Sequence, residues 1–410
     1  MKFFESLSSA SGLLAANSAG TYSMGLTEIS IPQIIMVLIG LFFVYLAIVK
    51  KYEPLLLLPL AFGIVIANIP MANLSAYSIT LSPDAATGLL VERQGLLNFL
   101  YDGIRYVIYP PLIFLCIGTM TDFGPLISSP KTAFIGLGGQ LGIFVAFFGA
   151  LFLGKWLGGA FPGFEGFSYG DAASIGIIGS SDGPTSIYAA SRMAPELLPM
   201  IAIAAFSYMA LVPFIQPPIM RMLTTPKERV VVMPKSQHVT QKQKILFPIA
   251  MTLITLLLVP TAGALIGMLM LGNLLRESGV TARYLETLQG PFLNILTILV
   301  ALSIGASTTA ELFLTPQTLI IVFLGLIAFC FGTAGGVLIA KLLYKLTGGK
   351  VNPLIGNSGV SAMPMAARIS QKVGQEYNSK NYLLMHAMGP LVSSTIASAI
   401  IAGIFISLYA

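Results

Sequence analysis

The chain has 410 residues, of which 56% are hydrophobic and only 9% are charged. Soluble domains carry roughly 25% charged residues, so this composition excludes an ordinary soluble globular protein. The formal net charge of +6 is modest, and most of it borders apolar segments. That distribution is typical of loops beside a membrane and argues against nucleic-acid binding.

The first 27 residues are rich in serine and alanine and lack a strongly basic start, so we expect no cleavable signal peptide. After them come apolar runs of about 20 residues, the length that crosses a hydrocarbon core of ~30 Å. About eleven segments are predicted, at 30–49, 54–70, 108–126, 132–154, 172–191, 197–220, 245–273, 290–308, 318–345, 351–370 and 381–409. We therefore expect an all-α, multi-pass protein of the plasma or inner membrane, with no appended soluble domain.

The expected parts of the chain are an N-terminal segment with the first span, a first transmembrane repeat, a basic loop and a second repeat, at residues 1–53, 54–222, 223–244 and 245–410. The stretch from Arg221 to Lys244 holds six basic residues and one acid. Short basic loops stay on the cytoplasmic side, so we expect this loop there. With about eleven crossings, the N-terminus is then inside and the C-terminus outside.

Three sequence matches recur in the same order in the two halves. Residues 55–61 resemble 256–262, and residues 178–190 resemble 355–367. Between them, a match joins Ile117, Gly118 and Thr121 to Ile304, Gly305 and Thr308. Each half then holds an odd number of segments, which places the halves in inverted orientation. Inverted repeats of this kind are a recurring plan of secondary transporters.

Segments 172–191 and 351–370 are rich in glycine, serine and proline and take matching places in the two repeats. Such a pair predicts two broken helices. Lipid tolerates a broken helix only where the freed backbone groups face protein, water or a ligand, so the breaks mark the predicted binding site. The glycines expected at the breaks are Gly179, Gly183, Gly356 and Gly359.

Asp182 lies within the first of these segments. A charged side chain at the bilayer centre costs at least ~2.5 kcal/mol, so we expect a cation partner. Sodium fits, because hard cations prefer oxygen ligands. Asn352 and Ser361 of the second segment offer neutral oxygens for the same ion. The alternative interpretation is that Asp182 is a loop aspartate capping a helix.

Arg368 and Tyr208 each allow two interpretations. A guanidinium binds carboxylates through two parallel hydrogen bonds, but an interfacial arginine also reaches lipid phosphate. Tyr208 lies in the middle of segment 197–220, where a tyrosine usually packs with its hydroxyl bonded to a neighbour. The sequence contains no P-loop, dinucleotide fingerprint, zinc-ligand spacing or nucleophile elbow.

Three motifs resemble one known family, the β subunits of sodium-translocating, biotin-dependent decarboxylases. The motifs are Gly179-Ser-Ser-Asp182-Gly-Pro-Thr185, the run from Asn352 to Arg368, and His386-Ala-Met-Gly-Pro390. Members of the family serve oxaloacetate, methylmalonyl-CoA or glutaconyl-CoA. The resemblance implies that this chain decarboxylates carboxybiotin and couples that step to sodium export, with consumption of a proton.

The resemblance also implies partners. Biotin would be carried by a separate biotin-carrier or carboxyltransferase subunit, and a small membrane subunit would complete a complex in which this chain forms a homo-oligomer. No nucleic acid is expected. The acid that is decarboxylated stays open, because another subunit binds it. The alternative function is a stand-alone sodium-coupled secondary transporter or antiporter, which the repeats and Asp182 fit equally well.

The resemblance assigns roles to single residues. In the family, the residues that match Asp182, Tyr208, Asn352, Gly356, Ser361 and Arg368 are implicated in ion passage or coupling. We expect Asp182, Asn352, Ser361 and Tyr208 to bind sodium, with Tyr208 also on the proton path, and Arg368 to orient the carboxylate of carboxybiotin. This chain departs from the family at Leu391, where the family carries an asparagine after the Gly-Pro pair. If that asparagine is a sodium ligand in the family, the site here is either rebuilt, with Ser393 or Ser394, or altered in its sodium stoichiometry.

Overall fold

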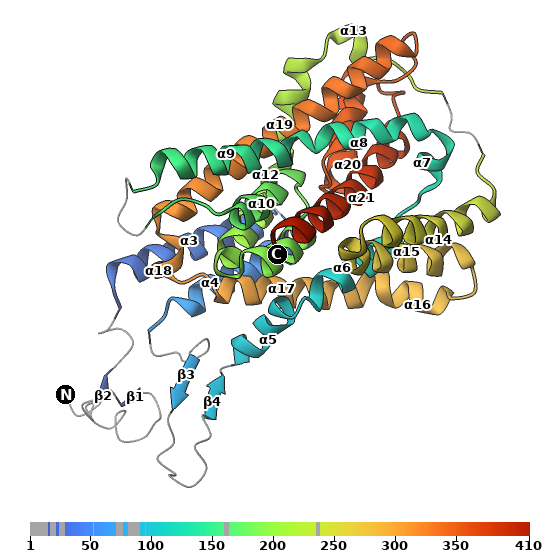
Figure 1. Cartoon of the computed structure of the whole chain (residues 1–410). Helices are drawn as coiled ribbons and strands as arrows, with labels where there is room; N and C mark the ends of the chain where they lie inside the picture. The colour runs from blue at the N-terminus through green and yellow to red at the C-terminus, as the bar shows by residue number, and fades with distance from the viewer. Residues whose placement is uncertain are drawn as a thin grey trace. The chain divides into compact units, whose positions relative to one another are not determined.

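The computed structural model describes residues 15–16, 22–23, 29–51, 53–70, 77–80, 91–94, 96–159, 164–234 and 238–410. These residues are almost all helical, which confirms the all-α fold (Figure 1). Short strands pair into two antiparallel hairpins, β1 (Ala15–Ala16) with β2 (Tyr22–Ser23) and β3 (Tyr77–Thr80) with β4 (Val91–Gln94). The N-terminal segment for which no signal peptide was expected lies almost wholly outside the described residues.

Within the described residues, five helical stretches are long and apolar enough to cross a membrane, and up to seven if each bent helix pair is one span. The five are Ile31–Ile48, Pro130–Leu157, Ala282–Ala306, Pro316–Leu346 and Leu384–Tyr409. These spans confirm a multi-pass membrane protein. The larger number of about eleven segments stays a prediction.

The chain divides into two compact units, residues 1–103 with 298–315, and residues 104–297 with 316–410. In the first unit, α3 (Ile31–Ile48) and α4 (Pro54–Ala67) pack together, and α18 (Ala310–Phe313) contacts α3. Helix α5 (Leu96–Arg105) ends just past the boundary, and α17 (Leu293–Ala306) crosses it.

The second unit holds all the remaining helices of the described chain. They are α6 (Tyr109–Met120), α7 (Gly124–Ser128), η1 (Pro130–Thr132), α8 (Ala133–Gly139), α9 (Leu141–Leu157), α10 (Tyr169–Ile177), η2 (Ile178–Ser180), α11 (Gly183–Met193), η3 (Pro195–Leu197), α12 (Leu198–Leu223), α13 (Pro226–Arg229), α14 (Gln241–Leu258), η4 (Pro260–Ala262), α15 (Gly263–Ser278), α16 (Ala282–Thr287), η5 (Leu288–Phe292), α19 (Pro316–Leu346), η6 (Pro353–Gly359), α20 (Met365–Tyr377) and α21 (Leu384–Tyr409).

One expected segment, 245–273, is wrong. The structure divides it into α14 and α15, which lie side by side (Figure 1). The physical reason is Pro260, which has no N–H for the helical ladder and starts the short helix η4 between the two. Apolar residues continue across this break, so hydropathy alone does not show it.

Each compact unit holds a similar close helix contact, and each contact joins a helix of the first expected repeat to a helix of the second. In the first unit, a Cβ atom on Gly305 of α17 would lie 2.1 Å from the Leu60 carbonyl oxygen of α4. In the second unit, a Cβ atom on Gly118 of α6 would lie 2.0 Å from the Leu269 carbonyl oxygen of α15. Gly118 and Gly305 are the glycines that the sequence repeat aligns, and only a residue without Cβ permits either approach.

A buried asparagine completes each of these contacts. The Asn68 amide donates to the Thr308 carbonyl at 2.8 Å, and the Asn273 amide donates to the Thr121 carbonyl at 2.8 Å. Thr121 and Thr308 are again aligned by the repeat. The residues that the repeat aligns therefore make similar contacts in the two units, and the repeat itself stays a prediction.

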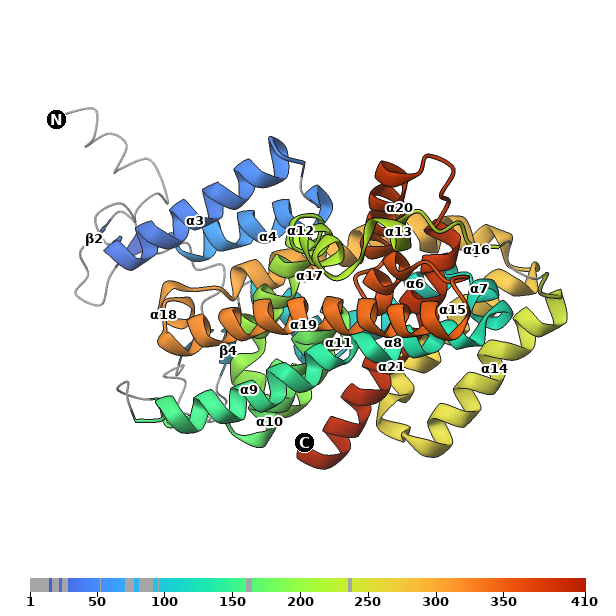
Figure 2. The same cartoon turned by 90° about the horizontal axis from the view of Figure 1, so that it is seen from above.

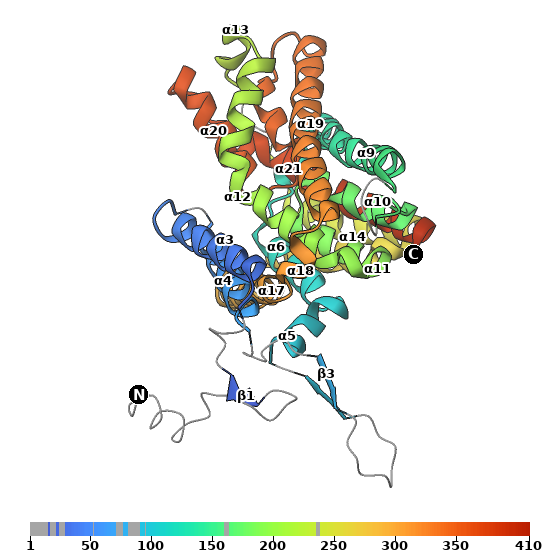
Figure 3. The ribbon, with the colours of Figure 1, turned by 90° about the vertical axis from the view of Figure 1, so that its left-hand side faces the viewer.

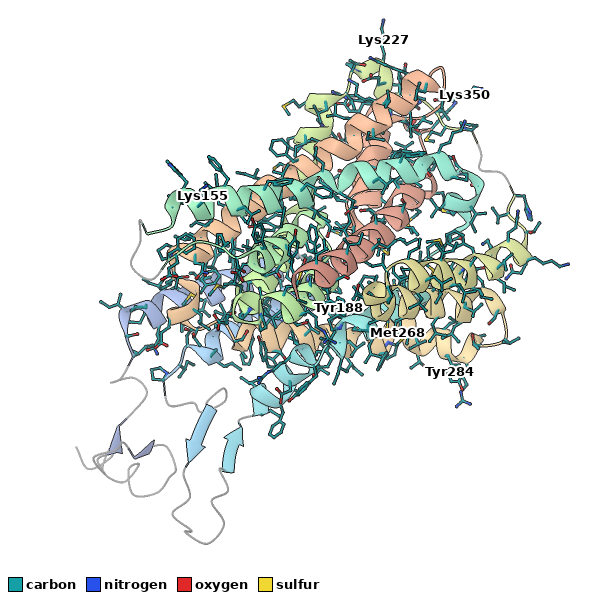
Figure 4. All side chains as sticks on the ribbon, viewed as in Figure 1. Lys155, Tyr188, Lys227, Met268, Tyr284 and Lys350 are labelled. Carbon is teal, nitrogen blue, oxygen red and sulfur yellow. The ribbon has the colours of Figure 1, made fainter. Side chains whose placement is uncertain are left out.

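Helix α9 carries an exposed aromatic stripe. Phe148, Phe152 and Trp156 follow one another at intervals of one helical turn and are 62%, 70% and 72% exposed. Lys155, at the end of the same helix, points away from the protein (Figure 4). Such a stripe, with tryptophan and lysine at its end, is typical of a face that meets lipid.

Glycines let the long helices cross the two Gly-rich segments. Helices α8 and α9 lie beside α19 (Figure 2). A Cβ atom on Gly139 of α8 would come within 1.6 Å of the Gly359 carbonyl oxygen, and one on Gly336 of α19 within 2.2 Å of the Gly356 oxygen. A Cβ atom on Gly179 would meet Gly142 of α9 at 2.3 Å. Backbone therefore packs directly on backbone around both segments.

This packing gives a stability prediction. We expect Gly139→Ala to lower the free energy of unfolding by about 3 kcal/mol or more, because the new methyl group overlaps backbone that cannot turn away. The measurement is the midpoint of thermal unfolding of the detergent-solubilised protein. The control is Gly267→Ala in α15, where a Cβ atom meets nothing within 4 Å. Equal midpoints for the two variants would contradict the packing.

Candidate functional site

The first Gly-rich segment is a broken helix. Helix α10 ends in the short helix η2, and Ser181 then adopts a left-handed conformation with φ of 57°. Asp182 caps the next helix, α11, and its Oδ1 accepts the Thr185 N–H at 3.3 Å. The capping interpretation of Asp182 therefore holds for one of its two carboxylate oxygens.

The second Gly-rich segment is broken in a different way. Asn352 caps η6, the chain runs extended at Val360, and α20 starts at Met365. The two breaks are joined directly, because the Ser361 N–H donates to the Ser180 carbonyl at 2.8 Å. Segments that lie far apart in the sequence thus meet at the point where each loses its helical hydrogen bonds.

The second carboxylate oxygen of Asp182 faces hydroxyl groups. Its Oδ2 accepts hydrogen bonds from Ser361 Oγ at 3.2 Å and from Ser398 Oγ at 3.0 Å. Ser361 Oγ also lies 2.7 Å from Thr395 Oγ1. We name Asp182, Ser361, Thr395 and Ser398 the Asp182 cluster. Each of the four is at most 5% exposed.

Asp182 is a buried carboxyl group to which no neighbouring side chain supplies a positive charge. Across the part of the chain that the structure describes, it forms no salt bridge with lysine, arginine or histidine. The same residues contain no group of three His, Cys, Asp or Glu side chains suited to a metal. One carboxylate among hydroxyls is a donor set for a hard cation, and an unpaired buried carboxylate is costly without one.

Two hydroxyl groups of the Asp182 cluster each have a second hydrogen-bond acceptor. Ser398 Oγ also lies 3.0 Å from the Thr395 carbonyl oxygen, and Thr395 Oγ1 lies 3.1 Å from that of Leu391. Each hydroxyl can therefore donate either toward the cluster or to its own helix. In the second orientation its oxygen lone pairs are free to face a cation.

Thr395 and Ser398 were not predicted from the sequence. The serines expected to rebuild the site lie elsewhere: Ser393 Oγ donates to the Ala133 carbonyl at 2.9 Å, and Ser394 Oγ accepts from Gln140 at 2.9 Å. Leu391 lies fully buried in an apolar cluster. Thr395 and Ser398 are three residues apart on one helical face, a spacing that points both at the same neighbour.

Asn352 is not brought to Asp182. Its amide nitrogen donates to the Arg229 and Val231 carbonyls at 3.0 and 2.8 Å, and its oxygen accepts the Leu354 N–H at 2.9 Å. Asn352 and Ser361 flank opposite ends of η6, whose seven residues span about 14 Å at the rise of a 3-10 helix. Asn352 holds one end of the broken segment, and Ser361 stands at the other.

Arg368 and Tyr208 have contrasting surroundings. Arg368, in the first turn of α20, is exposed and forms no ion pair with any described residue. Tyr208 is 3% exposed, and its hydroxyl donates to the Val322 carbonyl of α19. Its ring packs beside Ile178 of the first break, where Gly325 leaves room for both side chains.

Basic residues gather at one end of the second unit. Lys227 of α13 and Lys350, which follows α19, both lie at this end and point outward (Figure 4). At the same end, Arg221 pairs with Glu376 at 2.6 Å, and Lys341 lies 3.5 Å from Glu228. The expected segments place an odd number of crossings between Lys227 and Lys350, which would put the two lysines on opposite faces. The split of 245–273 into α14 and α15 adds one helix between them and accounts for their shared end.

The chain is similar to proteins of known activity over nearly its whole length. The family profile described as "Na+-transporting oxaloacetate decarboxylase beta subunit" matches residues 32–409. The methylmalonyl-CoA decarboxylase subunit beta of Propionigenium modestum is 49% identical over 95% of this chain and 98% of its own. The glutaconyl-CoA decarboxylase subunit beta of Acidaminococcus fermentans is 50% identical over 91% and 92%. The oxaloacetate decarboxylase beta chain of Klebsiella pneumoniae is 47% identical over 93% and 96%.

Proposed function

Since this chain belongs to the family of Na+-transporting decarboxylase β subunits, we propose that its Asp182 cluster binds the sodium ion that the pump transports. The observation that carries this proposal is the buried Asp182 carboxylate, which lacks a cationic partner among the described residues and lies where two broken helices join. Sodium supplies the missing positive charge. The hydroxyls of Ser361, Thr395 and Ser398 supply neutral oxygens.

The cluster has a simple way to bind and release its ion. With sodium bound, the hydroxyls of Thr395 and Ser398 donate to carbonyls of α21 and turn their lone pairs to the ion. Without sodium, Ser361 and Ser398 donate to the Asp182 carboxylate and stabilise its charge. Binding and release of the ion by the Asp182 cluster therefore require only that hydroxyl groups rotate, with no movement of the helices.

In this proposal Arg368 acts on carboxybiotin. When the carboxyl group leaves as CO2, the C–N bond breaks, its electron pair stays on the ureido group, and that group takes up a proton. A guanidinium holds the carboxylate through two hydrogen bonds and then stabilises the charge that develops. Arg368 is exposed and follows the second break by a few residues, so biotin bound there lies close to the sodium route.

Tyr208 lines that route in our proposal. It lies beside Ile178 of the first break, and its hydroxyl bridges α12 to the α19 backbone. The hydroxyl oxygen keeps a lone pair that can bind a passing sodium ion. The hydroxyl proton can be exchanged with the path along which protons move. Asn352 supports the sodium route indirectly, because its hydrogen bonds hold in place the end of η6 that lies opposite Ser361.

Biotin, in this proposal, arrives on a biotin-carrier or carboxyltransferase subunit, and a small membrane subunit and further copies of this chain complete the complex. Relatives named for three different substrates match this chain at 49%, 50% and 47% identity. Such equal similarity is expected if this subunit never contacts the acid that is decarboxylated. Carboxybiotin is the chemical group that all three reactions share.

The test is purification of this chain under mild detergent from its native membranes. We expect a biotinylated protein to co-purify, detected with labelled avidin, and sodium to stimulate release of CO2 from its carboxylated form. Sodium exchange by the isolated chain in liposomes, with no biotinylated partner, would favour the stand-alone carrier instead.

The orientation in the membrane gives a separate prediction. We expect cysteines at positions 227 and 350 to be labelled from the cytoplasmic face and a cysteine at position 410 from the opposite face, because the basic residues lie at one end. The measurement is labelling with a membrane-impermeant maleimide of intact cells and, separately, of inside-out membrane vesicles, in Lys227→Cys, Lys350→Cys and Ala410→Cys. Labelling of positions 227 and 410 from the same face would contradict the expected sidedness of the basic loop and the C-terminus, and labelling of positions 227 and 350 from opposite faces would contradict their shared end.

A further inference from the structure

A cavity of about 390 Å³ lies between the start of the span Pro130–Leu157 and the end of α19. Lys131 and Phe134 line one side of the cavity, and residues of α19 line the other. The apolar side chains at its rim are strongly exposed, with Phe134 at 60%, Leu342 at 51% and Leu346 at 73%. The cavity therefore opens outward, where a membrane protein meets lipid or a partner.

The packing of α19 explains which residues meet at the cavity. Helix α19 lies between α12 and α9 (Figure 3), and α8 packs on α19 beside α9. A Cβ atom on Gly138 of α8 would lie 2.5 Å from Cγ1 of Ile339. About two turns before Gly138, Lys131 shares the cavity with Thr347, which is about two turns after Ile339. The two helices are thus antiparallel, and Lys131 lies level with the end of α19.

The cavity has one charged group and an apolar wall. Lys131 is exposed and forms no ion pair with any residue that the structure describes. The Thr347 hydroxyl donates to a carbonyl of its own helix at 2.7 Å, so its proton is already engaged. Ile339, Leu342 and Leu346 follow one another along α19 at intervals of about one turn and form the wall. A ligand with an anionic head and an apolar chain matches this arrangement.

The charged mouth of the cavity lies at the basic end of the second unit. Lys345 is exposed in the last turn of α19, and Lys350 follows that helix. We expect this end to be cytoplasmic, because lysine and arginine gather on that side of a membrane. The cytoplasmic leaflet carries anionic lipids, and basic pockets between helices on that side bind their head groups.

We propose that this cavity binds an anionic phospholipid, with one acyl chain against α19 and the phosphate beside the Lys131 ammonium group. A flexible acyl chain fits the narrow space between two helices, whereas a further helix, about 10 Å across with its side chains, does not. The lipid lies beside α8 and α19, two helices whose glycines pack directly on the second broken segment at Gly359 and Gly356.

The test uses tryptophan fluorescence, because Trp156 is the single tryptophan of the chain. Phe134→Trp in a Trp156→Phe background places the reporter at the cavity. The full-length chain is reconstituted into vesicles that contain phosphatidylcholine and phosphatidylglycerol, with bromine atoms on the acyl chains of one lipid or the other. We expect phosphatidylglycerol to bind at the reporter about fivefold more strongly than phosphatidylcholine, the effect of one lysine at a membrane surface. Lys131→Gln should remove this preference.

The matched control is Lys155→Gln. Lys155 is exposed at the other end of the same span, so its loss should leave the preference at the reporter unchanged. Equal quenching by the two lipids, or a preference that survives Lys131→Gln, would overturn the proposal. Quenching by neither lipid would show that protein covers the cavity and would overturn it as well.

A second measurement leaves Phe134 in place, in case the reporter variant fails to fold. The detergent-solubilised chain is incubated with equal amounts of the two lipids, and the retained lipids are counted by native mass spectrometry. We expect the wild type and Lys155→Gln to retain phosphatidylglycerol preferentially and Lys131→Gln to retain about fivefold less of it. Equal retention by all three proteins would contradict the proposal. Neither readout involves sodium, so the result is independent of the Asp182 cluster.

Discussion

Asp182→Asn is expected to abolish the activation of decarboxylation by sodium. The amide keeps the shape of the side chain and still caps α11, because its oxygen accepts the Thr185 N–H as Oδ1 does now. What is lost is the negative charge that holds the ion. Removing one partner of a buried ion pair costs about 3 kcal/mol or more, which corresponds to more than a hundredfold in sodium affinity. The measurement is the decarboxylation rate of the assembled complex across a sodium series.

The matched control for this variant is Asp171→Asn. Asp171 lies on the same broken segment, in the first turn of α10, where its carboxylate closes a capping box with Ser168 at the protein surface. Asparagine preserves that cap, so the sodium series should match that of the wild type. An equal response of the two variants to sodium would mean that the Asp182 charge has no part in ion binding.

Arg368→Lys is expected to lower the turnover of carboxybiotin about a hundredfold, the typical cost of losing one preorganised donor to a developing charge. Lysine keeps the positive charge but cannot form the paired hydrogen bonds of a guanidinium. The rate with saturating carboxylated carrier should fall, whereas the sodium concentration at half-maximal rate should change little, because Arg368 is outside the Asp182 cluster.

Arg192→Lys is the control for the change of side chain. Arg192 is exposed in the last turn of α11, the helix that follows the first break as α20 follows the second. It should turn over carboxybiotin at the wild-type rate. Arg368→Lys with wild-type turnover would leave Arg368 as an interfacial anchor and nothing more.

The two helix breaks could be predicted because their cause is local. Glycine, proline and serine interrupt helical sequence at Gly179 and at Gly356, and the repeat places both interruptions at matching positions. From that pairing it also follows that Asp182 and Ser361 meet, which the structure shows at 3.2 Å. Here backbone chemistry and chain symmetry lead to the same conclusion.

The rest of the cluster could not be predicted in the same way. Thr395 and Ser398 lie on α21, an unbroken apolar helix in which single hydroxyls are common and usually bond to their own backbone. Only the packing of α21 against both breaks makes them part of the site. Asn352 shows the opposite case, because it belongs to the right segment but lies at the far end of η6 from Ser361.

The split of α14 from α15 could not be predicted for a different reason. Composition records how apolar a stretch is, but not whether it continues straight. Pro260 was visible in the sequence, yet α12 contains Pro213, Pro217 and Pro218 inside its helix. A proline alone does not decide between a bend and a turn, and the close packing of α15 on α6 decides it here.

We propose that sodium crosses through the Asp182 cluster only when carboxybiotin is decarboxylated. Uptake of radioactive sodium into liposomes that contain the assembled complex measures this directly. We predict uptake by the wild type and by Asp171→Asn that starts on addition of the carboxyl donor, and no uptake by Asp182→Asn. Uptake by Asp182→Asn at the wild-type rate, or wild-type uptake with no carboxyl donor present, would contradict the claim.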